Sequence, residues 1–482
     1  MTVPSTELAM PSSTDQSSDA TNADRPRLTP LLNWLFAFAA CVMVTNGNWH
    51  QAILNQMATW FGVAESDIAL IGTMNTVGYA LGLLFITPLG DMYSPKRLIL
   101  ILCVIVTILS ITLCFIPWLP VFITVEFFIG MAAVVPQIMV PVVADLAPPE
   151  RRGKAVGLIV SSIMLGVLVS RVLSGLVAEY TEWRVIYYIG CALNFVATIT
   201  LWFLLPDIPV QNEITYLELM KSLWKLLISE VVLQQVAVIG AFGFAGFTLF
   251  WTDLTFHLGA APFEYNSFII GLFGIIGIAG ISSSPIGGHI GDVYGPYVVV
   301  ILGYVLYAIS FIILMIWSTK LAAIIVGAFL LDFAMQIAQV ANGLRIFALL
   351  PTARSRGQAI QMVVFFLAGS VGTQAGAVVY QYNGWVTACG MGLGFILAAL
   401  AIHLARTPLQ KGFVPGWLRG GKWWVGVDVS EADFTGGVGK KEKVEMEKMR
   451  VDIETGAGKE RADGSESSEG TLVVEAAIAE RR

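Results

Sequence analysis

Long apolar runs and short polar connections alternate along most of this 482-residue chain. A helix needs about 20 apolar residues to cross the hydrocarbon core of a bilayer, and unpaired backbone groups are not tolerated inside that core. The pattern predicts twelve membrane-spanning helices, at residues 31–55, 69–89, 98–116, 121–144, 155–179, 185–205, 231–258, 268–290, 298–317, 321–343, 360–380 and 386–404. The sequence therefore predicts an all-α membrane protein.

The two halves of this pattern repeat each other. The stretch "ITPLGDMYSPKRLI" over 86–99 is answered by "SPIGGHIGDVYGPYVV" over 284–299, so that Asp91 and Asp292 hold equivalent places. "PERRGKAVG" is likewise answered by "TARSRGQAI", and "EYTEWRV" by "QYNGWVT", with offsets of 201 to 204 residues throughout. A duplicated six-helix unit of this kind places a binding site between the two halves, near the middle of the membrane.

The same pattern divides the chain into five parts. The predicted parts are a disordered cytoplasmic N-tail over 1–30, an N-terminal six-helix bundle over 31–205, a cytoplasmic linker over 206–230, a C-terminal six-helix bundle over 231–404 and a mostly disordered cytoplasmic C-tail over 405–482. In the linker, "TYLELMKSLWKLLI" places apolar residues at helical spacing beside Lys221 and Lys225. Such a segment favours an amphipathic helix that lies on the membrane surface.

The positions of lysine and arginine predict the orientation, because cytoplasmic loops carry an excess of these residues. With the N-terminus inside, the cytoplasmic loops and tail edges hold Arg25, Arg27, Lys96, Arg97, Arg151, Arg152, Lys154, Lys221, Lys225, Arg345, Arg354, Arg356, Arg406 and Lys411. The opposite side holds only Arg184 and Lys320. We therefore predict a multi-pass protein of the plasma membrane with both termini in the cytoplasm.

Composition excludes several other classes of protein. The chain is 56% hydrophobic and 13% charged, whereas soluble domains carry about 25% charged residues. A net charge of −6 leaves no basic face for nucleic acid. The five cysteines lie inside apolar runs without a CxxC pair, so we predict no metal and no cofactor. A P-loop and an HExxH motif are both missing from the sequence, and we predict that the protein is not an enzyme.

The twelve spans, their six-plus-six repeat and the charged loop after the second span resemble the major facilitator superfamily. The likeness is closest to its twelve-helix drug:proton antiporters and sugar-efflux permeases. Their loop signature, G-x-x-x-D-R/K-x-G-R-R/K, is matched here by Asp91 and by Lys96 and Arg97, whereas Met92 replaces the usual cation. The repeat copy keeps Asp292 between its glycines but has no basic residue. The resemblance implies two pseudo-symmetric six-helix bundles that alternate in opening a central cavity.

The resemblance also implies a cytoplasmic gate at the loop after the second span. There the aspartate accepts hydrogen bonds from a neighbouring helix N-terminus and pairs with nearby arginines, and this latch breaks when the cavity opens inward. The implied gate residues are Asp91, Lys96, Arg97, Arg151, Arg152 and Asp292, with Arg151 or Arg152 as the partner of Asp91. The alternative is that Asp91 only caps its helix and marks the interface.

Two charges stand inside the fourth and fifth spans, where the family pattern differs. The fifth span reads "GVLVSRVLSG", with Arg171 in place of the family's proline, and the fourth span has Glu126 instead of an arginine. A charge deep in a bilayer costs at least about 2.5 kcal/mol, so it faces a cavity or a partner. Because both residues lie at similar depth on neighbouring spans, we expect a Glu126–Arg171 ion pair. The pair is either a structural strut or a site where substrate or a proton competes.

Polar side chains recur at helical spacing on four spans. Asp332 is followed by Gln336 and Gln339 on one helix face, Asp253 by His257, and Asn48 by Gln51 and Asn55, and on the fourth span Gln137 shares a face with Glu126. The family lines its central cavity with spans one, four, seven and ten, which carry these stripes; hydrogen bonding between helices is the alternative. The predicted substrate and proton pathway consists of Asn48, Gln51, Glu126, Gln137, Arg171, Asp253, Asp332 and Gln336.

These features together predict a secondary active transporter. Asp332 and Glu126, followed by Asp253, are the candidate carriers of a coupling proton, because a carboxyl group buried in the membrane can take up a proton reversibly. The predicted activity is proton-coupled efflux of a small organic metabolite, toxin or drug. Uptake of a small organic nutrient is the alternative, and a non-transporting membrane sensor is a third possibility. The predicted partners are that small organic substrate, protons and the lipid bilayer, and we expect a monomer.

Overall fold

Helices occupy all twelve predicted spans in the computed structural model, which describes residues 28–148, 151–206, 215–349 and 354–405. The first half contains α2 (Pro30–Asn46), η1 (Trp49–Ala52), α3 (Leu54–Phe61), α4 (Glu65–Ile68), α5 (Leu70–Phe85), η2 (Thr87–Asp91), α6 (Pro95–Leu113), α7 (Leu119–Ala132), α8 (Val135–Leu146), α9 (Arg152–Tyr180) and α10 (Val185–Leu204). After α11 (Tyr216–Ser229), the second half contains α12 (Val231–Gly259), α13 (Ser267–Leu272), η3 (Phe273–Gly277), α14 (Ile278–Tyr294), α15 (Pro296–Ile316), α16 (Leu321–Leu349) and α17 (Arg354–Ala405).

Nine helices in the described ranges are long and apolar enough to cross a membrane. The longest, α17, covers the last two predicted spans and bends at Gly384, whose φ of 76° suits a residue without a Cβ atom. Two shorter apolar helices, Pro30–Asn46 and Ser267–Gly277, belong to the first and eighth spans, which short 3₁₀ segments interrupt. The predicted all-α membrane class is confirmed.

The break in the fourth span has its cause in the sequence. Pro120 lies in the first turn of α7 and Pro136 in the first turn of α8. Proline has no backbone N–H and its ring clashes with the preceding turn, so it begins a helix more readily than it continues one. The fourth span therefore consists of two helices, α7 and α8, that meet at residues 133–134, near the middle of the predicted span.

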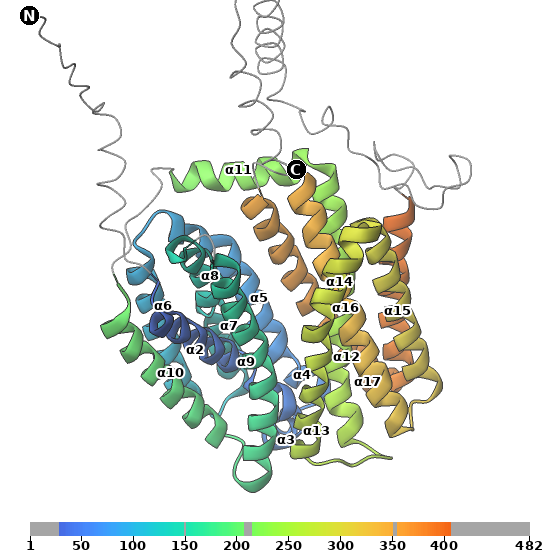
Figure 1. Cartoon of the computed structure of the whole chain (residues 1–482). Coiled ribbons are helices and arrows are strands. Elements are labelled where there is room, and N and C mark those ends of the chain that lie inside the picture. Colours follow the sequence, from blue (N-terminus) through green and yellow to red (C-terminus); the bar gives the residue numbers. More distant parts are fainter. Residues whose placement is uncertain (1–27, 149–150, 207–214, 350–353, 406–482) are drawn as a thin grey trace, which may run out of the picture. The chain divides into compact units, whose positions relative to one another are not determined.

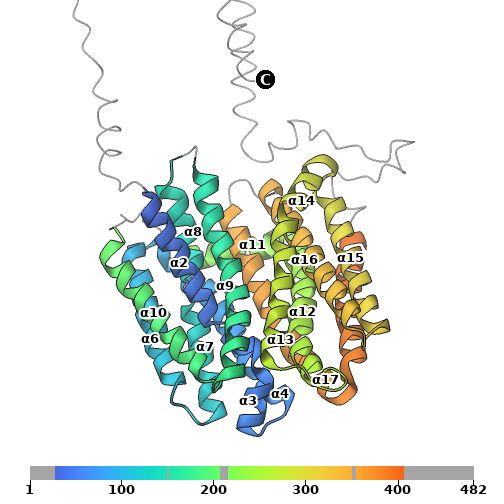
Figure 2. The same cartoon turned by 60° about the horizontal axis from the view of Figure 1, so that its bottom comes forward.

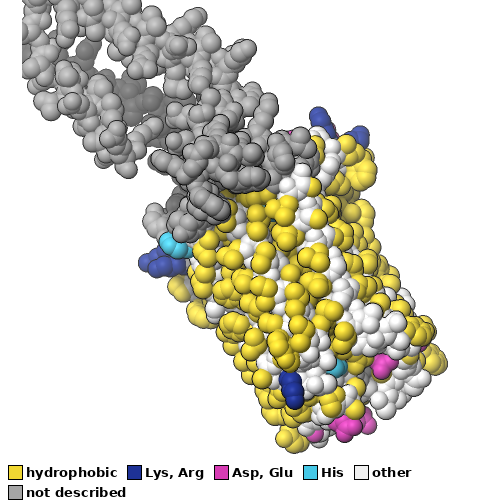
Figure 3. Space-filling model, turned by 90° about the vertical axis from the view of Figure 1, so that its right-hand side faces the viewer, with side chains coloured by type: hydrophobic (Ala, Val, Ile, Leu, Met, Phe, Trp, Pro, Cys, Tyr) yellow, Lys and Arg dark blue, Asp and Glu magenta, His cyan; other side chains and the backbone are white. Residues whose placement is uncertain are grey.

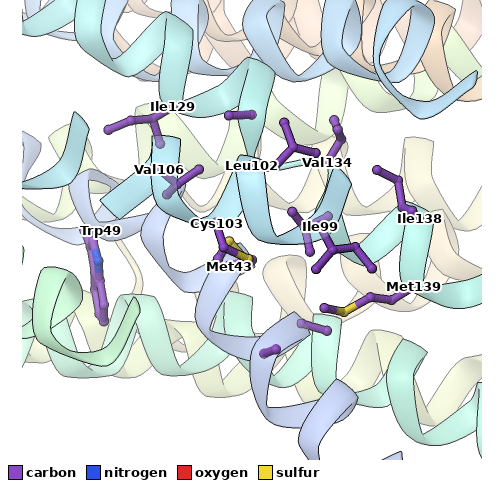
Figure 4. Close-up of a cluster of buried hydrophobic side chains, with 14 of the residues drawn as sticks. Met43, Trp49, Ile99, Leu102, Cys103, Val106, Ile129, Val134, Ile138 and Met139 are labelled. Carbon is purple, nitrogen blue, oxygen red and sulfur yellow. The ribbon is translucent and has the colours of Figure 1, made fainter. Parts of the chain in front are cut away.

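Each half has its own hydrophobic core. One cluster draws nearly all its buried members from residues 32–205, and a second draws its members from residues 239–399. Figure 4 shows part of the first cluster, in which Met43 and Cys103 lie close to Ile99 and Met139. The side of the protein seen in Figure 3 presents a broad hydrophobic band, with most Lys and Arg side chains toward the upper end and Asp and Glu toward the lower end. Such a band suits contact with lipid.

The two ends of the helix bundles differ. At one end α11 lies across the bundles, and at the other end lie α3 and α4 (Figures 1 and 2); we call these the α11 end and the α4 end. Leu223 of α11 packs against Val236 and Ile360, whereas Leu217 and Trp224 are exposed. The helix that the sequence predicts in the linker is therefore present, with an apolar side left uncovered.

Helices α5 and α7 approach each other closely through glycines. A Cβ atom at Gly78 would clash with the backbone oxygen of Phe127, and one at Gly130 would clash with that of Asn75. Small residues of this kind let helix backbones pack tightly in membranes. This contact fixes the rotation of α7 and hence the direction of its polar side chains.

We expect Gly78→Ala to destabilise the folded protein by about 1–3 kcal/mol, because the added methyl group overfills the α5–α7 contact. Thermal unfolding of the purified protein in detergent would measure this loss. Gly157→Ala in α9 is the matched control, because a Cβ atom there meets no neighbour within 4 Å and alanine favours the helix. Equal unfolding temperatures for the two variants would contradict the close packing.

Candidate functional site

A cavity of about 490 Å³ lies between the two bundles. Its walls come from α2, η1, α3, α5, α8 and α9 of the first half and from α12, η3, α14, α16 and α17 of the second half. Of the eight predicted pathway residues, six line it, namely Asn48, Gln51, Gln137, Arg171, Asp332 and Gln336. Residues far apart in the sequence thus meet at one cavity between the two halves.

Arg171 joins the two halves at this cavity. Its Nε donates a hydrogen bond of 2.6 Å to Oε1 of Gln51, in the first half. Its guanidinium carbon lies 3.8 Å from the centre of the Trp251 ring, in the second half. A cation over an indole face is attracted by the ring quadrupole, the more strongly when water is excluded. The arginine is thus held by an amide on one side and by an aromatic face on the other.

Trp251 extends this arrangement to Asp332. Its indole Nε1 donates a hydrogen bond of 3.1 Å to Oδ1 of Asp332. The other carboxylate oxygen, Oδ2, is buried without a hydrogen-bond partner among the described residues, although Asp332 lines the cavity. Trp251 therefore contacts a cation with its ring face and a carboxylate with its ring edge. The free oxygen of Asp332 is available to a bound molecule or a proton.

The short 3₁₀ segment in the first span positions Gln51, the hydrogen-bond partner of Arg171. Between α2 and α3 the chain forms η1, and there Nε2 of Gln51 donates a hydrogen bond of 2.6 Å to Oδ1 of Asn48. Asn48 in turn donates through Nδ2 to the backbone oxygen of Val44, at 2.7 Å. The orientation of Gln51 is therefore fixed, so that its amide oxygen faces Arg171.

Aromatic and methionine side chains form much of the remaining wall. Tyr79 of the first half and Phe366 of the second half contact each other, with ring centres 4.7 Å apart. Phe244 and Phe365 stack at 3.8 Å, and Gln137 donates a hydrogen bond of 3.2 Å to the Tyr79 hydroxyl. Sites for small organic molecules are mostly apolar with a few convergent polar groups, which describes this cavity.

Hydrogen bonds hold the two bundles together at the α4 end. Asn55 donates to the backbone oxygen of Thr255, at 2.8 Å. The backbone N–H of Ser66 donates to Gln381 at 3.2 Å, and Gln374 donates to the backbone oxygen of Ser66 at 3.0 Å. These bonds lie on the α3 and α4 side of the cavity, so this end is closed in the structure.

Helices α9 and α13 add a backbone contact to that closure. A Cβ atom at Gly175 would clash with the backbone oxygen of Ser267, and one at Gly271 would meet the backbone oxygen of Arg171. Gly175 of the fifth span and Gly271 of the eighth span therefore face each other. Arg171, which lines the cavity, lies beside this crossing.

The predicted ion pair between Glu126 and Arg171 is wrong. Oε2 of Glu126 accepts a hydrogen bond of 2.9 Å from Asn75 in α5, while Arg171 faces Gln51 and Trp251. Glu126 is 1% exposed and does not line the cavity; its partner Asn75 does. The close α5–α7 packing turns Glu126 toward α5, so similar depth on neighbouring spans did not bring the two charges together.

Asp253 also lies away from the cavity. Its side chain is fully buried in α12, and both carboxylate oxygens lack a hydrogen-bond partner within the described chain. Its closest surroundings include Gly376 of α17. Asp253 is therefore enclosed within the second bundle rather than placed between the two bundles.

The structure describes only part of the predicted gate. The backbones of Asp91 and Asp292 lie in η2 and α14, but their side chains lie outside the described part of the structure. Lys96 and Arg97 belong to the first turn of α6, and Arg151 and Arg152 to the start of α9. These four residues lie at the α11 end, where α5 and α8 finish. The latch remains a prediction.

Sequence reasoning did not select several residues of the site. Asn75 and Tyr79 line the cavity, as do Thr248, Phe365 and Phe366. The polar ones among them stand singly in apolar runs and form no stripe of carboxamides or charges. These residues lie on spans two, seven and eleven and face the polar residues of the other spans. The sequence does not show which spans face each other, so these residues could be selected only once the packing of the spans was known.

We expect Glu126→Gln to preserve stability, because the amide oxygen can still accept the hydrogen bond from Asn75. Glu126→Met, which has similar length but no comparable acceptor, should lower the free energy of unfolding by about 1–3 kcal/mol. Unfolding in detergent measures both variants. If the Gln variant were as unstable as the Met variant, the negative charge of Glu126 would have a partner other than Asn75.

Known proteins resemble this chain in sequence and fold. A family model described as Major Facilitator Superfamily matches residues 35–284. The putative uncharacterized transporter YgaY of Escherichia coli (strain K12) is 32% identical over 375 residues, which cover 78% of this chain and 95% of YgaY. The bicyclomycin resistance protein homolog of Haemophilus influenzae is 25% identical over 153 residues, 32% of this chain and 38% of that protein.

A solved structure shows the same fold. The bacterial homolog of the human lysosomal transporter Spinster, in an inward-facing and unoccupied conformation, aligns with a TM-score of 0.64 at 11% identity, over 77% of this chain and 95% of that chain. At this identity the likeness concerns the fold alone. Together with the family match, it confirms the predicted fold of twelve transmembrane helices in two six-helix bundles. The chain is a multi-pass membrane protein and belongs to the Major Facilitator Superfamily of transporters.

Proposed function

We propose that this transporter exports a small organic metabolite, toxin or drug in exchange for protons, by alternating access. The observation that carries the proposal is the cavity between the bundles, where Arg171, Trp251 and Asp332 meet. Both halves contribute to it, so a movement of one bundle against the other changes access to the bound molecule. We propose the six lining residues predicted from sequence as the substrate pathway, with Glu126 acting on it through Asn75.

The chemistry of the cavity suits an amphipathic or aromatic organic substrate. Phe244, Phe365 and Phe366 offer aromatic faces, and Met335 and Met362 offer adaptable apolar contacts. One guanidinium and one carboxylate are the charges among its lining residues. A substrate with an acidic group can bind Arg171, and one with a basic group can bind Asp332.

We infer an orientation from the charges at the two ends. Exposed basic side chains at the α11 end include Arg97, Arg151, Arg152, Lys221 and Lys225. By the positive-inside rule we infer that this end faces the cytoplasm, and we propose that both tails, 1–30 and 405–482, are cytoplasmic and that the protein belongs to the plasma membrane. We further propose the bundle borders 31–205 and 231–404, the linker 206–230 and a monomeric state.

In this orientation the closed α4 end faces outward, so the structure corresponds to an inward-open or occluded stage of the cycle. Outward opening requires that the bonds of Ser66 to α17 and of Asn55 to Thr255 break. The proposed cytoplasmic gate around Asp91 and Asp292 would then close the α11 end. Alternating access follows from this reciprocal arrangement.

Export is favoured over uptake by two observations. One partial relative is named as a bicyclomycin resistance protein homolog, and the sequence after the sixth span reads "LPDIPVQ", unlike the P-E-S-P-R run of the family's sugar importers. The alternative is proton-coupled uptake of a small organic nutrient, which the same cavity could serve.

Deleting the gene and comparing metabolites inside and outside the cells tests the direction. We expect the substrate to accumulate inside the deletion strain, because its exit pathway is missing, and to return to the wild-type level when the gene is restored. Restoration with an Arg171→Ala variant serves as the control for loss of the site. Loss of growth on one nutrient, without intracellular accumulation, would contradict export and support uptake.

We expect Asp332→Asn to lower transport driven by a pH gradient at least about tenfold, equivalent to about 1.4 kcal/mol in the limiting barrier, because the amide cannot exchange a proton. Exchange of labelled for unlabelled substrate without a gradient should persist in proteoliposomes, since it needs no net proton movement. Asp67→Asn, at an exposed position of α4, is the matched control. A gradient response that survives in Asp332→Asn would exclude Asp332 as the coupling carboxylate.

A further inference from the structure

Two opposite charges lie beside one indole ring in the cavity, with no hydrogen bond from one to the other. Trp251 holds the guanidinium of Arg171 against its ring face, at 3.8 Å, and donates to Oδ1 of Asp332 at 3.1 Å. Oδ2 of Asp332 is buried without a hydrogen-bond partner in the described ranges. The hydrogen bond between Arg171 and Gln51 uses Nε, so the terminal Nη1 and Nη2 groups remain available. Each charged group therefore keeps hydrogen-bonding capacity for a bound molecule.

Glycines of η3 leave space beside both charged groups. A Cβ atom at Gly274 would lie 3.0 Å from the Cβ of Arg171, and one at Gly277 would lie 3.6 Å from Oδ2 of Asp332. Residues three apart in a 3₁₀ helix share one face and are separated by about 6 Å along its axis. Both glycines line the cavity. The two charges therefore border one short strip of glycine backbone, over which a small molecule can reach both.

The balance of charge selects what can bind there. With Asp332 ionised, an anion is attracted by Arg171 and repelled by Asp332, whereas a cation meets the reverse, and such forces are strong where water is excluded. A neutral molecule that carries both charges avoids this conflict. Its carboxylate can accept two hydrogen bonds from the guanidinium, and its ammonium group can donate to Oδ2 of Asp332.

Aromatic rings continue the cavity wall away from the two charges. The ring centre of Phe247 lies 6.4 Å from that of Trp251, and Phe244 follows at 5.7 Å from Phe247. Phe365 of α17 stacks on Phe244 at 3.8 Å. These four side chains all line the cavity. A molecule whose charged end lies at Trp251 can therefore pack an aromatic or bulky apolar side chain against this row of rings.

We propose that the substrate is a zwitterion of the amino-acid type, with its acid on Arg171, its ammonium group on Asp332 and an aromatic or bulky apolar side chain along Phe247 and Phe244. This inference rests on the proposed function and names the class of its substrate. The zwitterion and a proton compete for Asp332. When the ammonium group binds Oδ2, the proton on that carboxyl group passes to water on the open side of the transporter.

Binding to the purified full-length protein, followed by the shift of its unfolding temperature with ligand concentration, tests the class directly. Phenylalanine is compared with 2-phenylethylamine, which lacks the acid, and with 3-phenylpropionate, which lacks the amine. We expect phenylalanine to bind at least about tenfold more tightly than either, because each analogue loses a hydrogen bond to a charged group. Tryptophan and β-phenylalanine extend the test to a larger ring and a wider charge separation. If none of the three zwitterions binds more tightly than both analogues, the proposal is overturned.

Two variants assign the charges, because each should change the order of affinities in its own direction. In Asp332→Asn we expect 3-phenylpropionate to bind at least as tightly as phenylalanine, since the carboxylate no longer repels it and the ammonium group has lost its partner. In Arg171→Gln, 2-phenylethylamine should gain in the same way. Asp67→Asn, at an exposed position of α4, is the matched control and should keep the wild-type order. If Arg171→Gln does not fold, Asp332→Asn decides alone, and an unchanged order in it would overturn the assignment.

The pH dependence of binding separates the substrate class from the proposed proton exchange. Phenylalanine stays a zwitterion from neutral to mildly acidic pH, so we expect acidification to weaken its binding by up to about tenfold per pH unit, the limit for competition with one proton. The other titratable side chains that line the cavity are His50, Tyr79 and Arg171, and Tyr307 of α15 lies near Asp332. If the zwitterion is preferred but its affinity ignores pH, the exchange for protons fails and the substrate class stands. If transport follows the pH gradient without any preference for zwitterions, the class fails and the proposed function stands.

Discussion

The contact of Arg171 with Gln51 and Trp251 is the interaction on which the arrangement of the two bundles depends. A guanidinium group is always charged at physiological pH, and inside a membrane it must be surrounded by groups that replace water. Here the amide of one half and the indole of the other supply that environment, and the indole also binds Asp332. Because this cation needs contacts from both halves in place of water, it holds the two halves together at this point.

The polar centre is supported by close packing around it. Glycines let α5 approach α7 and let α9 approach α13, so each helix has one allowed rotation rather than several. Asn48 and the 3₁₀ segment η1 fix Gln51, and Tyr79 is fixed by Gln137 and Phe366. The cavity is therefore shaped both by glycine contacts outside it and by hydrogen bonds and ring contacts among its own lining residues.

Much of the fold could be predicted from sequence, because the length of an apolar run reports directly on the thickness of the membrane. The stripes on spans one and ten led to Gln51, Asp332 and Gln336, since helical periodicity reports which residues share a face. Periodicity does not report which neighbour that face meets. For this reason the expected pairing of Glu126 with Arg171 failed, and single polar residues such as Asn75 were overlooked. The side chains of Asp91 and Asp292 lie outside the described residues, so the latch remains a sequence-based prediction.

The crossing of α9 and α13 at Gly175 and Gly271 has a consequence for the energetics of the cycle. Backbone meets backbone there, so the contact consists of dispersion forces and weak Cα–H···O interactions rather than of interlocked side chains. Parting the backbones at these two glycines leaves no empty side-chain socket, so the crossing itself adds little to the cost of opening this end. That cost then lies in the neighbouring polar contacts of Arg171, Asn55 and Ser66.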